Sequence, residues 1–168
     1  MTAADSHKGL LHGKLVLNET ITIPPHKASI YIQNGQVFTS AGYTTVDQYY
    51  ANCKFELREI ETKPREITPD SFTIKRVIFE ENLSAQPASL RYALNLSSRM
   101  HISSGGLSYV DYATVMMLHS DKQPHVFRLS CQHWEDPNLA ADHLSIEQIQ
   151  QTLGKLFTLI PAKLVESE

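Results

Sequence analysis

Apolar and polar residues alternate along the first part of the chain, which predicts short β-strands. Residues 11–17 alternate with a period of two, the period of a half-buried strand, and residues 21–23 continue it. Pro24-Pro25 end this run, because proline has no N–H to donate to a neighbouring strand. A second β-prone run, Ile30-Tyr31-Ile32, precedes Asn34-Gly35, a pair that predicts a tight hairpin because both residues tolerate positive φ.

The clearest assignment of faces lies in a strand predicted at residues 49–60. Cys53, Phe55 and Leu57 point to one side, and the polar residues between them point to the other, as in an antiparallel strand with one wet face. Further β-rich segments cover residues 72–79, 90–96 and 109–134. The last of these contains the turn-like sequence D-K-Q-P, so Tyr109–Trp134 is predicted to form a long hairpin.

Near the C-terminus the period changes from two to between three and four. One apolar stripe recurs at these steps, formed by Ile146, Ile149, Leu153, Leu156, Phe157 and Ile160. Ser145 and Gln148 have the spacing of a capping box, and Pro161 would stop the helix. The pattern predicts a helix of about four turns over Ser145–Ile160, which must cover one side of the sheet because it cannot fold alone.

These elements fit one domain in a chain of 168 residues. We expect a flexible N-terminal arm over residues 1–9 and a single β-rich domain over residues 10–168. The predicted fold is mainly β: an antiparallel β-sandwich, or alternatively an open barrel, with one C-terminal amphipathic helix.

Composition and charge exclude several classes of protein. Apolar residues make up 42% of the chain and charged residues 20%, which argues against intrinsic disorder. The formal net charge of −3 and the absence of a basic block argue against a nucleic-acid binder. No apolar run approaches the roughly 18 residues of a transmembrane helix, so no transmembrane segment is expected.

Cys53 and Cys131 are the only cysteines, and both fall on the predicted inward face of a strand. Two interpretations are open at this point. The thiols can be two separate buried groups that pack as small hydrophobes, or they can form a disulfide between strands or across the sandwich. Closing so long a loop would stabilise the fold by about 4 kcal/mol in the chain-entropy model.

Five segments of the first half form a further pattern: Gly13–Leu17, Thr22–Pro25, Tyr31–Val37, Tyr49–Arg58 and Ile67–Phe72. Together they resemble small proteobacterial envelope proteins made with a signal sequence or lipobox. The strand leading to Ile23-Pro24-Pro25 also resembles the start of small lipoproteins of the YbaY kind. The resemblance implies a periplasmic location, which favours the disulfide, and it leaves open a lipid anchor on the precursor. It implies no activity and no catalytic residues.

Eight histidines raise the question of a metal site. The candidate ligands are His119, His125 and His133, with Cys131 on the same strand face as His133. Met100-His101 and Met116-Met117 would suit copper. None of these has a recognised ligand spacing, so scattered histidines without a metal are the favoured interpretation, and no cofactor is expected.

The motifs of catalysis are also missing from the sequence. Ser103, Ser104 and Ser108 surround Gly105-Gly106 and Asp111 follows, but no G-x-S-x-G elbow is present, and the glycines fit a turn. No phosphate-binding glycine motif occurs either. The sequence therefore predicts a protein that is not an enzyme.

Tyrosines are the remaining candidates for a functional surface. Tyr49, Tyr50, Tyr109 and Tyr112 could line an interaction face, or could simply pack on the sheet as strong β-formers. Our first expectation is a periplasmic protein that binds another protein or an envelope component. The alternative is a carrier of a small ligand or of copper or zinc, with a pocket between the sheet and the helix. A concave apolar pocket with convergent polar groups would favour the alternative, and a flat tyrosine-bearing face without a pocket would favour the first expectation.

Overall fold

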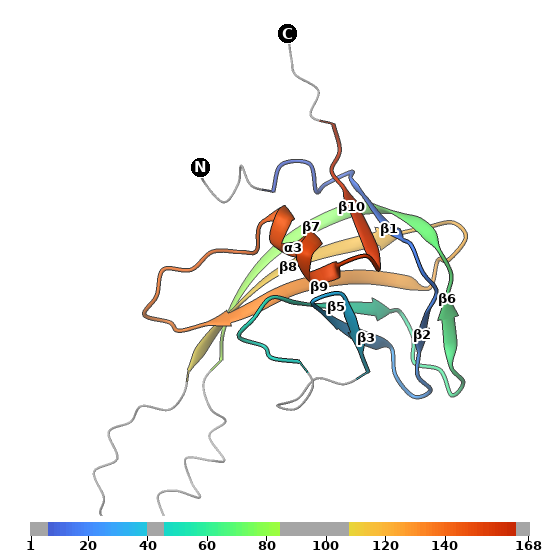
Figure 1. Ribbon diagram of the computed structural model, residues 1–168, viewed down its shortest axis with the longest axis horizontal. Coiled ribbons are helices and arrows are strands. Elements are labelled where there is room, and N and C mark those ends of the chain that lie inside the picture. Colours follow the sequence, from blue (N-terminus) through green and yellow to red (C-terminus); the bar gives the residue numbers. More distant parts are fainter. Residues whose placement is uncertain (1–6, 40–45, 85–107, 164–168) are drawn as a thin grey trace, which may run out of the picture.

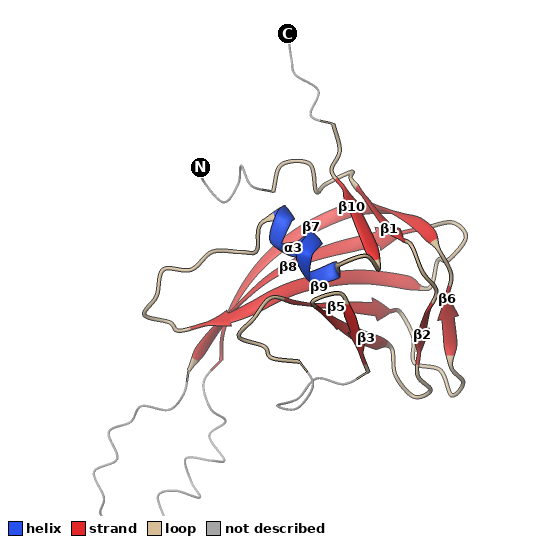
Figure 2. Ribbon diagram, in the orientation of Figure 1, coloured by secondary structure: helices blue, strands red, loops and turns tan. Residues whose placement is uncertain are grey.

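The computed structural model describes residues 7–39, 46–84 and 108–163. Its strands are β1 (Lys14–Leu17), β2 (Ile21–Ile23), β3 (Ser29–Gln33), β4 (Gln36–Phe38), β5 (Asn52–Leu57), β6 (Arg65–Ile67), β7 (Asp70–Ser84), β8 (Tyr109–His119), β9 (Val126–Glu135) and β10 (Phe157–Ile160). The helix α3 (Ile146–Leu153) lies between β9 and β10 in the chain (Figure 2).

Eight of the strands form one antiparallel sheet in the order β10-β1-β7-β8-β9-β5-β3-β4. The sheet curls into a half-barrel (Figure 1), while β2 and β6 pair separately as a two-stranded ribbon. A mainly β, antiparallel fold with a C-terminal helix is thus confirmed. Of the two predicted arrangements, the open-barrel alternative describes the curled sheet.

The hydrophobic core lies on the concave side of the curl. Phe55 on β5, Phe72 on β7 and Phe157 on β10 are fully buried there. The ring centroid of Phe55 lies 5.4 Å from that of Phe157 and 6.2 Å from that of Phe72. Because β5 and β10 belong to opposite flanks of the sheet, these contacts show that the curl brings the two flanks together around one core.

The predicted C-terminal helix is half as long as expected. Its start is correct: the Ser145 hydroxyl accepts from the Gln148 backbone N–H, and the Gln148 side chain accepts from the Ser145 N–H. The helix ends at Gly154, and Phe157–Ile160 form β10 against β1. The last apolar residues are spaced by three or four, which predicted a helix. Phe157 and Leu159 are instead buried and alternate with exposed residues, as in a strand. No helix in the described ranges is long and apolar enough to cross a membrane.

The end of α3 meets the turn between β3 and β4. Asn34-Gly35 forms the predicted hairpin turn with positive φ at both residues, and the Gly35 N–H donates to the Thr152 carbonyl at 2.9 Å. A Cβ on Gly154 would lie 2.6 Å from the Gly35 Cα, so the approach requires glycine. The helix therefore connects the β10 flank to the β3–β4 edge across the open side of the half-barrel.

Other predicted segments have mixed outcomes. The long hairpin is confirmed as β8 and β9, which pair from Val110↔Glu135 to Met117↔Arg128. The wet face predicted for β5 is wrong at Asn52, which is fully buried and donates to the Tyr50 carbonyl. Residues 90–96, Met100-His101, Ser103, Ser104 and Gly105-Gly106 lie outside the described residues, as do residues 1–6 of the predicted arm. His7, within that arm, is buried with its Nε2 2.6 Å from the Leu144 carbonyl oxygen.

Candidate functional site

A disulfide joins the two strands that form the floor of the candidate site. Cys53 on β5 and Cys131 on β9 are directly opposite each other, with 4.0 Å between their Cα atoms and 2.06 Å between their sulfurs. Both side chains are fully buried on the concave face. Of the two interpretations of the cysteines, the disulfide is the correct one. Ala51 lies two residues before Cys53, and His133 lies two residues after Cys131. Both therefore share the face of the disulfide, and both line the pocket described next.

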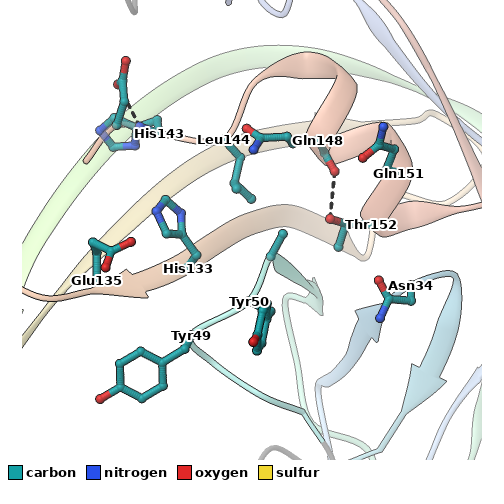
Figure 3. A pocket seen from close by; sticks show the side chains of 12 residues that line it. Asn34, Tyr49, Tyr50, His133, Glu135, His143, Leu144, Gln148, Gln151 and Thr152 are labelled. Carbon is teal, nitrogen blue, oxygen red and sulfur yellow. Dashed lines mark hydrogen bonds between the residues drawn. The ribbon is translucent and has the colours of Figure 1, made fainter. Parts of the chain in front are cut away.

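A pocket of about 550 Å³ opens between the end of β9, the segment before β5 and the exposed side of α3 (Figure 3). Its lining comes from four parts of the chain that are distant in sequence: Asn34, Tyr49, Tyr50, Ala51, His133, Glu135, Asp142, His143, Leu144, Gln148, Gln151 and Thr152. The volume falls in the range of small-molecule sites. A pocket between the sheet and the helix was predicted for a ligand carrier, but an apolar one. Most of the side chains that line the observed pocket are polar.

The two histidines of the pocket are held in their uncharged form. Burial lowers the pKa of His133 and of His143 below the usual imidazole value, although nearby carboxylates oppose this. The Nδ1 atoms of both rings are buried and have no hydrogen-bond partner among the described residues. A buried polar atom without a partner is costly unless a ligand or solvent supplies one. Both nitrogens are therefore buried polar atoms that the described residues leave unsatisfied.

His143 sits in an aromatic cage behind the pocket. Its ring centroid lies 5.1 Å from that of Phe79 and 5.7 Å from that of Tyr112, both in edge-to-face geometry. Its Nε2 lies 3.7 Å from the Glu81 carboxylate. Tyr112 also stacks on His133, with 5.6 Å between their centroids. These ring contacts orient both imidazoles without using their Nδ1 atoms.

The four predicted interaction tyrosines do not form one face. Tyr49 and Tyr50 line the pocket, and Tyr49 also contacts Trp134 edge to face at 5.6 Å. Tyr109 stacks on Trp134 at 3.8 Å between centroids. Tyr112 is opposite His133 in the register and so shares the side of the sheet that carries the pocket histidines, whereas Trp134, which is opposite Asp111, lies with Tyr109 on the other side.

The three histidines considered as metal ligands are also separated. His119 and His125 flank the β8–β9 turn, where His119 forms an exposed ion pair with Asp121 at 2.9 Å. His133 lies near the far end of β9, about 26 Å from His125 at the usual rise per residue. Within the described ranges, no three His, Cys, Asp or Glu side chains form a group that could hold a metal ion.

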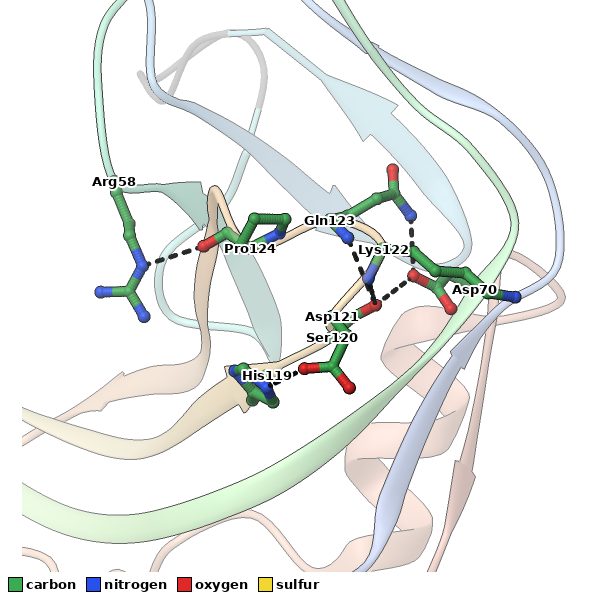
Figure 4. Close-up of polar contacts among 8 residues, drawn as sticks. All are labelled: Arg58, Asp70, His119, Ser120, Asp121, Lys122, Gln123 and Pro124. Atoms are coloured by element: carbon green, nitrogen blue, oxygen red, sulfur yellow. Dashed lines mark hydrogen bonds and ion pairs between the residues drawn. The ribbon is translucent and has the colours of Figure 1, made fainter.

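A second polar cluster surrounds the β8–β9 turn (Figure 4). The Asp70 carboxylate accepts from the Ser120 hydroxyl at 2.5 Å and from the Gln123 amide at 3.1 Å. Gln123 also exchanges two hydrogen bonds of 3.0 Å with the backbone of Thr68. Burial raises the pKa of Asp70, but these hydrogen bonds outweigh it and the net pKa is lowered. The cluster fastens the turn to the start of β7.

Asp111 follows the candidate serines in the sequence and lies on the outer face of the sheet. Its environment there is unusual. Burial, reinforced by the charge of Glu80, raises the pKa of its carboxyl to about 6. Its Oδ1 has no partner in the described part of the chain. Asp111 is opposite Asn82 on β7 and Trp134 on β9, so it does not face the pocket.

Sequence reasoning missed most of the pocket. Glu135, Asp142 and His143 occupy the end of a strand and a loop, where no periodicity draws attention to them. Gln148 was identified only as a cap, and Gln151 was not singled out. The only available signal was the pair of adjacent ionisable residues Asp142-His143 just before a helix cap.

Comparisons with known proteins give no relative from which a function could be transferred. No family model matches the chain. No curated protein and no solved structure matches it either. A function must therefore be argued from the pocket and its chemistry.

Proposed function

We propose that this protein is a non-enzymatic binding protein that holds a small polar ligand in the pocket between β9 and α3. The observation that carries the proposal is an open pocket of about 550 Å³ whose lining is mostly polar and comes from four separate parts of the chain. Ligand sites are concave and place a few polar groups where they fix the orientation of the ligand. The pocket has this arrangement, with His133, His143 and Gln151 among its lining residues.

A binding role has more support than catalysis because the described lining offers no activated nucleophile. It contains no serine or cysteine, and the hydroxyl of Thr152 donates to the Gln148 carbonyl at 2.8 Å. Covalent catalysis needs a nucleophile within reach of a base. Neutral histidines without such a neighbour serve better as hydrogen-bonding groups.

The proposed location is the periplasm, or another oxidising compartment outside the cytoplasm. The Cys53–Cys131 disulfide supports this, because stable structural disulfides form mainly in such compartments. The resemblance of the first half to proteobacterial envelope proteins points the same way. A small envelope component is then one natural ligand class.

The tyrosine face that we first expected has less support as a protein-binding surface. The rings of Tyr49 and Tyr109 are engaged with Trp134, and Tyr112 lies on the other side of the sheet. The metal-carrier alternative has less support as well, since His119, His125 and His133 are far apart.

Binding can be tested with the single tryptophan of the chain, Trp134, which contacts the pocket residue Tyr49. A panel of neutral, cationic and anionic polar metabolites is titrated, with tryptophan fluorescence and calorimetry as readouts. Gln151→Phe should fill part of the pocket and weaken any bound metabolite by about tenfold or more, the loss expected for a blocked site.

The matched control is Glu147→Phe, on the same helix but outside the pocket lining. This variant should leave binding unchanged. The proposal is wrong if no member of the panel binds saturably, or if both variants weaken binding equally.

A further inference from the structure

One edge of β7 has no neighbouring strand over more than half of its length. β1 pairs only with Asp70–Thr73, and Ile74 then bonds to the backbone of His12 and Gly13. Beyond Ile74, β7 continues to Ser84 with β8 on one side (Figure 1). No described residue forms a backbone hydrogen bond with the other side of this part of the strand. Within the described ranges it is therefore an open strand edge.

The two borders of the eight-stranded sheet are protected, in contrast to this edge of β7. An unpaired strand edge is a template for another strand, and proteins usually cover it or keep it short. The edge of β10 is covered by the Gln150 side chain, which donates to the Phe157 carbonyl at 2.8 Å and accepts from the Leu159 N–H at 2.7 Å. At the opposite border, β4 has only three residues. The open edge of β7 is both longer and uncovered by described residues.

On the outer face of this edge, a cation and an anion flank an apolar residue. Arg76, Ile78 and Glu80 occupy alternate positions and therefore point to one face. Asn82 continues the series and is opposite Asp111, which places the series on the outer face. Arg76 and Glu80 are exposed, and neither forms an ion pair with a described residue. Four residues of strand span about 13 Å, so these two side chains do not pair with each other.

A second copy of the same segment matches these side chains when it runs antiparallel. If two copies of β7 pair about Ile78, Arg76 of each copy is opposite Glu80 of the other on the outer face. On the inner face, Val77 of each copy is opposite Phe79 of the other, whose side chain is 47% exposed. The segment is thus complementary to itself in charge and in hydrophobicity, as a two-fold symmetric interface requires.

We propose that the protein forms a homodimer in which the open edges of β7 pair antiparallel about Ile78, so that the sheets of two half-barrels become continuous. The pairing ends near Lys75, because Ile74 is already bonded to His12 and Gly13. The register shifts between Ile74 and Arg76, and such a bulge bends its strand, so the open edge does not continue the line of β1. No described lining residue of the pocket belongs to β7, so this inference does not depend on the proposed function.

The first test measures the mass of the full chain by sedimentation velocity, at protein concentrations that extend into the millimolar range. A monomer–dimer equilibrium is expected, and hydrogen exchange of the amides from Arg76 to Glu80 should slow as the dimer forms. A chain that stays monomeric at every concentration overturns the proposal. If these amides are protected in that monomer, the edge is covered by another part of the same chain instead.

Variants that exchange the two charges test the pairing itself. Arg76→Glu places a glutamate opposite Glu80 at two symmetric positions, so two exposed ion pairs become two like-charge pairs. The dimer should weaken by about tenfold or more. Glu80→Arg should weaken it by a similar factor, because it places two arginines opposite each other. The double variant Arg76→Glu with Glu80→Arg restores both ion pairs and should return the dimer affinity to near that of the wild type.

The matched control is Glu66→Arg, an exposed charge reversal on β6, outside the proposed interface. It should leave the dimer affinity unchanged. Arg76 and Glu80 are exposed, so all the variants should fold, and circular dichroism checks this. A dimer that resists both single reversals, or that the folded double variant fails to restore, overturns the pairing about Ile78.

Discussion

Two polar clusters, one at each end of the β8–β9 hairpin, differ in how their side chains are bonded. At the turn end, Asp70, Ser120 and Gln123 bond to one another and to the backbone of β7 and its approach. At the other end, roughly 30 Å away along the ten residues of β9, His133 and His143 have ring nitrogens with no partner among the described residues. The second end is held by a disulfide and by the helix instead.

This difference shows how a polar cluster that holds structure can be distinguished from one that is open to a ligand. Buried polar atoms are nearly always satisfied in folded proteins, and the side chains of Asp70, Ser120 and Gln123 are satisfied by neighbours, whereas Nε2 of His125 beside the same turn has no partner among the described residues. Where the covalent bridge and the core of α3 supply the stability, polar side chains need not bond to each other. Polar side chains without bonds to one another then line the pocket.

The largest expected effect comes from removing the bridge at the pocket end. Replacing Cys53 and Cys131 together by alanine should lower the free energy of unfolding by about 4 kcal/mol, because the bridge closes a long loop (sequence separation 78). Denaturant titration measures the loss. Hydrogen exchange should accelerate around Ala51 and His133 more than at Ser120. A loss under about 1 kcal/mol, or equal acceleration at both ends, would contradict a disulfide that holds the pocket end.

At the turn end, Asp70→Ala should destabilise the fold by about 2 kcal/mol, since it leaves Ser120 and Gln123 without their acceptor. The pKa of Asp70 is lowered in the folded state, so its contribution is present above the unfolded value of 3.8 and is lost as pH falls through the folded pKa. Chemical denaturation at neutral and acidic pH tests this. Ligand binding should not change, and a loss of affinity would break the distinction between the two ends.

On the outer face of the sheet, at the pocket end of the β8–β9 hairpin, Asp111→Asn should stabilise the protein. The folded carboxyl has a pKa of about 6 against a usual 3.8, so its ionised form is disfavoured in the folded state. Above pH 6 the wild type contains this charge and the variant does not, so the variant should be about 1–2 kcal/mol more stable after allowance for solvent screening. The gain should disappear below pH 3.8, where both side chains are neutral. A gain that is independent of pH would refute the assigned cause.

The smallest effect on stability is expected at the pocket itself. His143→Gln should lower the unfolding free energy by about 1 kcal/mol near neutral pH, because it removes ring contacts with Phe79 and Tyr112 but no hydrogen bond to Nδ1 from the described residues. The folded pKa of His143 is lowered, so below the unfolded value of 6.5 the unfolded state takes up its proton first and the wild type loses stability. The variant should therefore gain relative to the wild type as pH falls, a gain that parallel melts can detect. A large loss at neutral pH would mean that His143 holds structure.

Local signals in the sequence predicted local structure well. Asn34-Gly35 predicted the turn, Ser145 with Gln148 predicted the cap, and the alternation around Cys53 placed its sulfur inside the sheet. The length of the helix was not predictable in the same way, because the apolar spacing beyond Gly154 fits a helix as well as a strand, and pairing with β1 decides between them.

The pocket could not be predicted because its residues meet only through the curl of the sheet. Asn34, Tyr50, His133 and Gln151 come from four separate segments, and no spacing in the chain connects them. The cysteines at positions 53 and 131 were the one long-range signal, since a bridge between them requires β5 and β9 to be neighbours.

The most direct test of a ligand-binding pocket is a titration with the panel of neutral, cationic and anionic polar metabolites, followed by amide and histidine NMR signals. The account predicts that the shifted signals cluster at Tyr50, His133, His143 and Gln151, while those of Ser120 and Gln123 stay in place. Shifts gathered at the β8–β9 turn, or spread evenly over the sheet, would contradict it.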